Sequence, residues 1–182
     1  MTNRNSRWKT GLAILLITIC LVNAGCSKSE AQDQIKESIK TVVELQMNAP
    51  DERAILKDEP TSSHEEEGFF DAYNKYLEEE YAPYFTVDAF ERYILTSELV
   101  TFQWAANRYD YQLKVNEVSV EQNEVTPTNY NFTVNLDYVN KDGETTTIEL
   151  TGVAIMRDDK IAKISYLGDK QLIRSLLDGG LK

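Results

Sequence analysis

Two cysteines and a single histidine are the side chains best suited to nucleophilic or metal chemistry in this sequence: Cys20, Cys26 and His64. A thiolate attacks electrophiles, binds metals or accepts a covalent group, and an imidazole exchanges protons near neutral pH. His64 is predicted to lie in a polar loop and precedes three glutamates, with no second ligand at helical spacing, so we expect no metal ion and no other cofactor. The surroundings of the two thiols therefore decide what chemistry they undergo.

Cys26 ends a segment that has the features of an export signal. Arg4, Arg7 and Lys9 precede an apolar run over residues 12–22, which contains one threonine and no charge. As a helix, these 11 residues would span about 16 Å, whereas the hydrocarbon core of a bilayer is about 30 Å thick. The run is therefore too short to be a good permanent anchor.

The residues before Cys26 resemble the lipobox of bacterial lipoproteins. The small residues Ala24 and Gly25 directly precede the thiol, although Asn23 stands where the motif usually has an aliphatic residue. The resemblance implies that a signal peptide over residues 1–25 is removed and that Cys26 becomes lipidated, followed by a tether over residues 26–32. Two acyl chains hold a protein stably at a membrane. We expect a lipid-anchored protein on the extracytoplasmic face of the cell membrane; an ordinary secretory peptide and an uncleaved short anchor are the alternatives.

The mature chain would be free of thiols and strongly acidic. Cys20 leaves with the signal and Cys26 carries the lipid, which excludes disulfides and cysteine catalysis. The chain has 19 Lys and Arg against 30 Asp and Glu, a net charge of −11, and loss of the three basic signal residues makes it −14. Most of this charge falls within residues 30–80. Such a surface repels phosphate backbones, so we expect no nucleic acid partner.

The first half of the predicted domain, which we place at residues 33–182, has helical periodicity. We expect an amphipathic helix over residues 31–48, a short helical piece over 50–56 and a second long helix ending near Tyr81. A third helical stretch over residues 87–106 contains several β-branched residues, which favour a break near Thr96 and Ser97.

After Tyr109 the apolar pattern changes to the period of two that is typical of strands. Its phase shifts at Asn116 and Glu117, as a β-bulge would cause. Turns are predicted at residues 141–144 and 157–160, which separate antiparallel strands, and a short helix over 169–177 closes the chain. Helices followed by hairpin-linked strands indicate an α+β domain in which helices pack on a curved sheet.

This order of elements, with Tyr84-Phe85-Thr86 leading into Asp88-Ala89-Phe90-Glu91, resembles the nuclear transport factor 2-like superfamily. The resemblance covers most of residues 32–167 and implies a cystatin-like cone. The mouth of the cone would lie between helices and sheet, and the helix after Gly168 would plug or flank it. Members of the superfamily bind small ligands, catalyse isomerase or dehydratase reactions, or contact proteins, so the fold alone does not choose among these functions.

The strand pattern does not supply a catalytic base. Isomerase-like members place an acid or a histidine inside the cone, whereas alternation sends Asp137 and Glu149 to the opposite face from Phe132 and Leu150. We therefore expect no enzyme. The function predicted is a non-catalytic module that binds a protein partner or a small apolar ligand, with a small-molecule isomerase or lyase of the same fold as the alternative.

Aromatic residues crowd into residues 69–111, and most of them are expected in the core. A ligand pocket would need side chains with an apolar body and a polar tip. Tyr73, Trp104 and Tyr138 have this character and are the predicted pocket lining.

Overall fold

The computed structural model describes residues 29–55 and 63–181, without the side chains of residues 63–70. The chain divides into two compact units, residues 1–35 and residues 36–182. In the first unit, residues 29–35 are helical, which includes residues 29–32 of the predicted tether. Glu30 and Asp33 suit the start of a helix because acidic side chains interact favourably with its positive end. The signal peptide, Cys26 and residues 26–28 of the tether lie outside the described residues.

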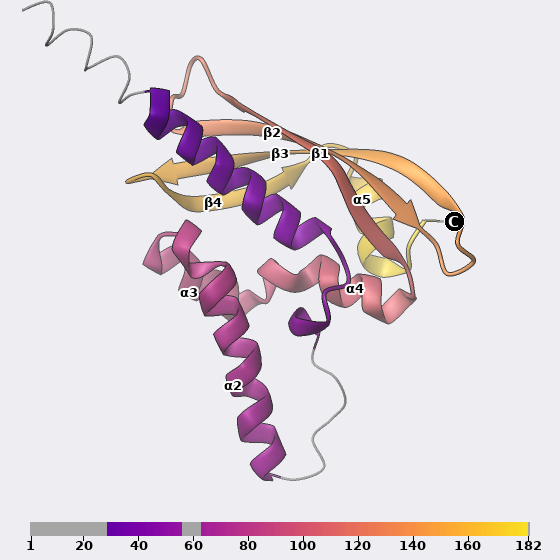
Figure 1. The fold of residues 1–182 in the computed structure, drawn as a ribbon. Coiled ribbons are helices and arrows are strands. Elements are labelled where there is room, and N and C mark those ends of the chain that lie inside the picture. Colours follow the sequence, from indigo (N-terminus) through magenta and orange to yellow (C-terminus); the bar gives the residue numbers. More distant parts are fainter. Residues whose placement is uncertain (1–28, 56–62, 182) are drawn as a thin grey trace, which may run out of the picture. The chain divides into compact units, whose positions relative to one another are not determined.

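The second unit has the predicted α+β architecture. It begins with a helix over residues 36–47, followed by η1 (Glu52–Ala54), α2 (Ser63–Glu80), η2 (Ala82–Tyr84), α3 (Val87–Thr96), η3 (Glu98–Val100) and α4 (Thr101–Tyr109). Strands β1 (Gln112–Gln122), β2 (Asn129–Val139), β3 (Thr145–Arg157) and β4 (Lys160–Leu167) follow, and α5 (Lys170–Asp178) ends the chain. The sheet is antiparallel with the order β1-β2-β3-β4, and the helix over 36–47 lies across it (Figure 1).

Local sequence signals account for the irregularities of this chain. The helical stretch after Thr86 breaks as predicted, because Ser97 takes a left-handed conformation at φ 56° between α3 and η3. The register of β1 against β2 shifts between Val115 and Glu117, which confirms the predicted bulge. In the β3–β4 turn Asp158 and Asp159 both have positive φ, which matches the twist of a tight hairpin.

The core lies between the inward face of the sheet and the helices. Ile39, Val42, Val43 and Met47 of the first helix are fully buried, as the periodicity predicts. On β2 the even-numbered residues 130–138 are all buried, so Asp137 lies on the other face of the sheet, and Glu149 of β3 is exposed. The predicted orientation of these two carboxylates is confirmed.

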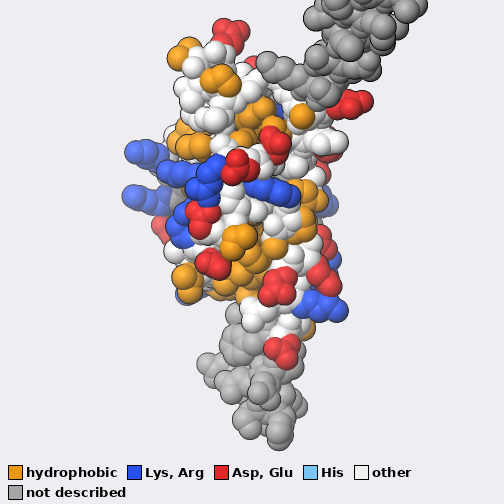
Figure 2. All heavy atoms as spheres, turned by 90° about the vertical axis from the view of Figure 1, so that its left-hand side faces the viewer, with side chains coloured by type: hydrophobic (Ala, Val, Ile, Leu, Met, Phe, Trp, Pro, Cys, Tyr) orange, Lys and Arg blue, Asp and Glu red, His pale blue; other side chains and the backbone are white. Residues whose placement is uncertain are grey.

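Helix α3 protects the outer edge of the sheet. Tyr93 lies against the free edge of β4, where its hydroxyl donates to the carbonyl of Ile164 and accepts from its N–H, both at 2.9 Å. Arg92 donates to the carbonyl of Ala162, and Arg157 forms an ion pair with Asp88. Figure 2, which looks at this side of the molecule, shows Lys and Arg side chains grouped at mid-height with acidic side chains among them. This surface is therefore of mixed charge.

None of the described helices combines the length and the apolar character needed to cross a bilayer.

Candidate ligand cavity under the C-terminal helix

A cavity lies between α5, β4 and the η3–α4 segment. Its inner part has a volume of about 240 Å³, and an outer part of about 410 Å³ opens more widely to solvent. The two parts share Tyr166, Ile173 and Leu177, so they are continuous. We call this space, with both parts, the α5 cavity. Its total size is in the range of small-molecule sites, which is about 300–1,000 Å³.

The inner part of the α5 cavity is lined mainly by aromatic and aliphatic side chains. Its deepest residues are Tyr93, Phe102, Ile164 and Gln46, each at most 6% exposed. The full lining of the inner part is Gln46, Tyr93, Glu98, Thr101, Phe102, Ile164, Ser165, Tyr166, Ile173 and Leu177.

Tyr166 forms the wall that both parts share. Its ring packs edge to face on Phe102 and Phe132, with ring centroids 5.3 and 5.4 Å away. Its hydroxyl donates to Oε1 of Gln46 at 2.8 Å, and burial raises the pKa of this phenol above its ordinary value. Tyr166 therefore presents a neutral ring to the cavity, with its hydroxyl already bonded.

A glycine makes room for this aromatic stack. Gly152 of β3 faces Phe132 of β2, and a Cβ atom at this position would lie 2.1 Å from Cζ of the Phe132 ring. Because real Cβ contacts are never this close, a larger residue would displace Phe132 and, with it, the support for Tyr166.

Helix α5 is held at its C-terminal end. Leu176 is fully buried, and its carbonyl accepts a hydrogen bond of 2.7 Å from the hydroxyl of Tyr111. The Tyr111 ring packs on Tyr138 at 5.0 Å, and Gly180 lies so close that a Cβ atom there would be 2.4 Å from the Tyr138 hydroxyl oxygen. Asp169 caps the start of the helix, where its side chain accepts from the N–H groups of Gln171 and Leu172. These contacts fix the helix face that presents Ile173 and Leu177.

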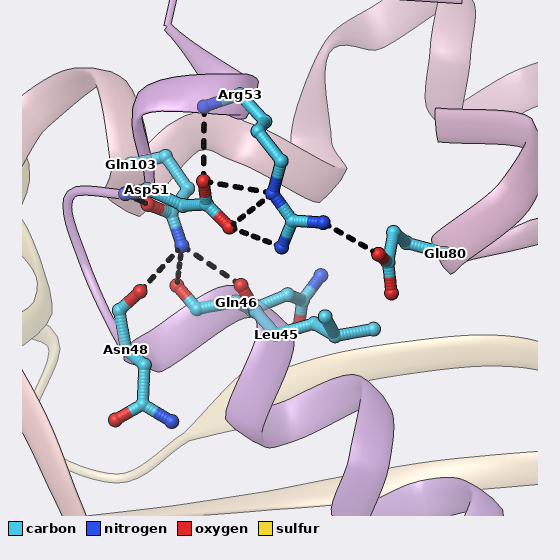
Figure 3. A network of polar contacts seen from close by, with 7 residues as sticks. All are labelled: Leu45, Gln46, Asn48, Asp51, Arg53, Glu80 and Gln103. Atoms are coloured by element: carbon cyan, nitrogen blue, oxygen red, sulfur yellow. Dashed lines mark hydrogen bonds and ion pairs between the residues drawn. The ribbon is translucent and has the colours of Figure 1, made fainter. Parts of the chain in front are cut away.

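A buried glutamine fixes the helix end that carries Gln46. The carboxamide of Gln103, on α4, is fully buried; its Nε2 donates to the carbonyls of Leu45 at 2.8 Å and Asn48 at 3.0 Å. Its Oε1 accepts from the N–H of Asp51 at 2.6 Å (Figure 3). One side chain thus satisfies the last carbonyls of a helix and the first N–H of the next segment, which would otherwise be unpaired.

An ionic cluster extends this network towards α2. Arg53 bonds to both carboxylate oxygens of Asp51 and forms an ion pair of 2.7 Å with Glu80 (Figure 3). Hydrogen bonds from Arg53 lower the pKa of the Asp51 carboxyl. The guanidinium also lies 4.9 Å from the centre of the Tyr76 ring. These contacts join η1 to α2 and leave the α5 cavity untouched.

The outer part of the α5 cavity is more polar. Its remaining lining residues are Lys170, Arg174 and Asp178, all exposed on α5. A further hollow of about 780 Å³ is lined only by α5 and Gly179 and Gly180. Because one helix and the two glycines after it line that hollow, we take the α5 cavity, whose inner part is lined by side chains from several elements, as the candidate site.

The structure places the three predicted pocket residues in separate surroundings. Tyr73 is half-buried on α2, where desolvation raises its pKa to about 12. Trp104 donates from Nε1 to the carbonyl of Ala54 at 2.9 Å. Tyr138 is buried against Tyr111. None of them lines the described cavities, so their role in ligand binding stays a prediction.

Residue 64 lies in the first turn of α2 and not in the loop that we predicted, and its side chain lies outside the description. Its neighbours in sequence are three glutamates, which suit the start of a helix. Within the described residues, no group of three or more His, Cys, Asp and Glu side chains could hold a metal ion.

The sequence pattern does not single out Tyr166, Ile173, Leu177 and Gln46 as cavity residues. The strongest available signal was the apolar pattern of α5, where Leu172, Ile173, Leu176 and Leu177 recur at helical spacing. We predicted that this helix would plug or flank the mouth of the cone, and in the structure it flanks the α5 cavity. Which of its residues face inward depends on its docking, which the helical pattern does not specify.

No protein-family model and no curated protein matches this sequence. Among solved structures, the chain is similar to a protein described as the transfer protein TraH from the Gram-positive conjugative plasmid pIP501. The identity is 13%, the TM-score 0.47, and the match covers 77% of this chain and 96% of that one. A protein described as a polyketide cyclase from Pseudomonas putida KT2440 has 14% identity and a TM-score of 0.33, covering 41% and 62%. A protein described as a SnoaL-like polyketide cyclase from Mesorhizobium loti has 22% identity and a TM-score of 0.27, covering 36% and 54%.

Proposed function

We propose that this chain is a lipid-anchored, extracytoplasmic binding module that holds a small apolar ligand in the α5 cavity without transforming it. The proposal rests on the observation that the hydroxyls of two tyrosines in the cavity wall are already hydrogen-bonded within the protein. The hydroxyl of Tyr93 bonds twice to the backbone of Ile164, and that of Tyr166 bonds to Gln46. A ligand would therefore contact mainly the apolar rings of these two residues, which favours the binding of hydrocarbon groups.

The proposal that nothing is transformed rests on the position of the available carboxylate. Glu98 is the acidic residue in the lining of the inner part, and it is exposed to solvent. Catalytic carboxylates are usually tuned by burial and held against the substrate. An isomerase or lyase acting in this cavity would depend on Glu98, whereas a module that only binds an apolar ligand would not. We therefore expect Glu98→Gln to change ligand affinity by less than about twofold, which is less than 0.5 kcal/mol.

The sequence around Cys26, which precedes the described residues, supports the lipid anchor. Cys26 follows small residues and an apolar run too short to span a bilayer, which is the setting of a lipidated cysteine. Palmitate labelling of the full chain in a bacterial host tests this directly. We expect label in the wild type and none in Cys26→Ala; label that persists in the variant would contradict the anchor.

Ligand binding is tested with the mature chain carrying Cys26→Ser, which contains every described residue. The probe is N-phenyl-1-naphthylamine, an uncharged fluorophore whose emission rises in apolar surroundings. Ile173→Phe adds volume inside the α5 cavity, whereas Leu172→Phe makes a similar change on the same helix at a residue that lines neither part.

We expect Ile173→Phe to weaken probe binding at least about tenfold, equivalent to about 1.4 kcal/mol. Leu172→Phe should bind the probe with an affinity close to that of the wild type. Circular dichroism should show that both variants are folded. Equal affinities for the two variants, or no binding by the wild type, would contradict the proposed site.

A further inference from the structure

We propose that the α5 cavity selects a single-chain amphiphile that bears one carboxylate, a fatty acid, with its headgroup at Lys170 and Arg174 and its chain directed towards Phe102. This inference rests on the proposed function, because it names the ligand class for the same cavity. It is carried by the way in which charge and hydrocarbon are distributed along the cavity.

Two cations stand at the wide end of the cavity. Lys170 and Arg174 are four residues apart on α5, which brings side chains to the same side of a helix. Both are exposed, and no ion pair involves either of them among the described side chains. In a chain with a net charge of −11, this pair forms a local positive site beside an apolar opening.

The net charge at the wide end of the cavity, which we call the rim, matches that of a monoanion. Asp178 lines the same outer part, so the three charged side chains together carry a charge of +1. A carboxylate neutralises that charge. A phosphate monoester carries nearly two negative charges at neutral pH, so its binding would leave excess negative charge beside Asp178. Arg174 adds a planar donor pair that fits the two oxygens of a carboxylate.

Apolar side chains line the cavity behind the rim. Ile173 and Leu177 lie next to the cations and belong to both parts of the cavity, and Phe102 and Ile164 line the inner part behind them. Glu98 belongs to the inner part and not to the outer one. Its negative charge disfavours a carboxylate at that end, so the charges orient the ligand with its headgroup at Lys170 and Arg174.

The test compares two ligands that differ only at the headgroup, hexadecanoate and hexadecan-1-ol, each kept below its aggregation concentration. Each displaces N-phenyl-1-naphthylamine from the mature chain carrying Cys26→Ser at neutral pH. We expect hexadecanoate to bind about tenfold more tightly than the alcohol, because two partly exposed charge pairs each contribute a few-fold. This preference should decrease as salt is added.

The double variant Lys170→Gln/Arg174→Gln should lose the preference for hexadecanoate over hexadecan-1-ol. The double variant Lys114→Gln/Lys141→Gln removes the same charge from exposed residues that line neither part, and it should keep the preference.

The outcomes separate the two proposals. If the alcohol binds as tightly as the acid, or if both double variants behave alike, the fatty-acid inference is overturned and the apolar binding function stands. If neither ligand displaces the probe, both proposals fail.

Discussion

Replacement of Gln103 by leucine should destabilise this protein more than any other single polar substitution that we consider. The side chain is fully buried and forms short hydrogen bonds with three backbone groups: the carbonyls of Leu45 and Asn48 and the N–H of Asp51. A longer contact of 3.4 Å reaches the carbonyl of Gln46. Leucine has a similar volume but no polar atoms, so all three groups would lose their partner. A buried group left unpaired costs about 1–3 kcal/mol.

Because Asn48 is exposed and Asp51 is half-buried, water can reach part of this segment in the variant, so the three losses do not add in full. We expect the free energy of unfolding to fall by about 3–5 kcal/mol, a large fraction of the 5–15 kcal/mol typical of a domain. Urea unfolding followed by circular dichroism measures this loss. Asn107→Leu, at an exposed position of the same helix, is the matched control. A Gln103→Leu unfolding midpoint equal to that of the control would show that these hydrogen bonds do not stabilise the fold.

Three further predictions concern the surroundings of the cavity and the response to pH. Gly180→Ala should lower the melting temperature more than Gly143→Ala, because both glycines have φ near +80° but only Gly180 would bring a Cβ atom against Tyr138; equal shifts would show that Tyr138 does not hold this end of the chain. The pKa of Asp51 is lowered in the folded state, so its ion pair stabilises the protein above the ordinary carboxyl pKa and the effect is lost as pH falls through the folded value. Asp51→Asn should therefore cost about 0.5–1 kcal/mol at pH 7 and almost nothing in acid, as measured by urea unfolding at several pH values; a cost that stays constant with pH would be inconsistent with the ion pair. Burial raises the pKa of Tyr73 to about 12, so its neutral form stabilises the fold fully below pH 10 and this contribution disappears as pH rises towards 12. Tyrosinate absorbance and circular dichroism in an alkaline titration should change together above pH 10, and full ionisation of the tyrosines with no loss of structure would contradict this.

The features that the sequence predicts correctly are those that short-range chemistry decides. The break at Ser97 follows from β-branched neighbours, the bulge at Glu117 from a phase change within one strand, and the turn at Asp158 from residues that tolerate positive φ. Each of these signals lies within a few residues of the feature itself. Alternation also placed Asp137 correctly on the outer face of the sheet.

The candidate site could not be predicted in the same way, because its contacts join distant segments. Tyr166 meets Gln46 across 120 residues, and Gln103 meets Leu45 across 58. No periodic pattern indicates which glutamine will be buried or which face of α5 will close a cavity. The prediction of Tyr73, Trp104 and Tyr138 relied on residue type alone, and residue type does not specify where a side chain points.

Chemical-shift mapping tests most directly whether apolar ligands enter the α5 cavity. The isotope-labelled mature chain carrying Cys26→Ser is titrated with hexadecan-1-ol, and the amide and methyl signals are followed. We expect saturable shifts concentrated at Phe102, Ile164, Ile173 and Leu177. An absence of shifts, or shifts concentrated on residues that do not line this cavity, would contradict binding at this site.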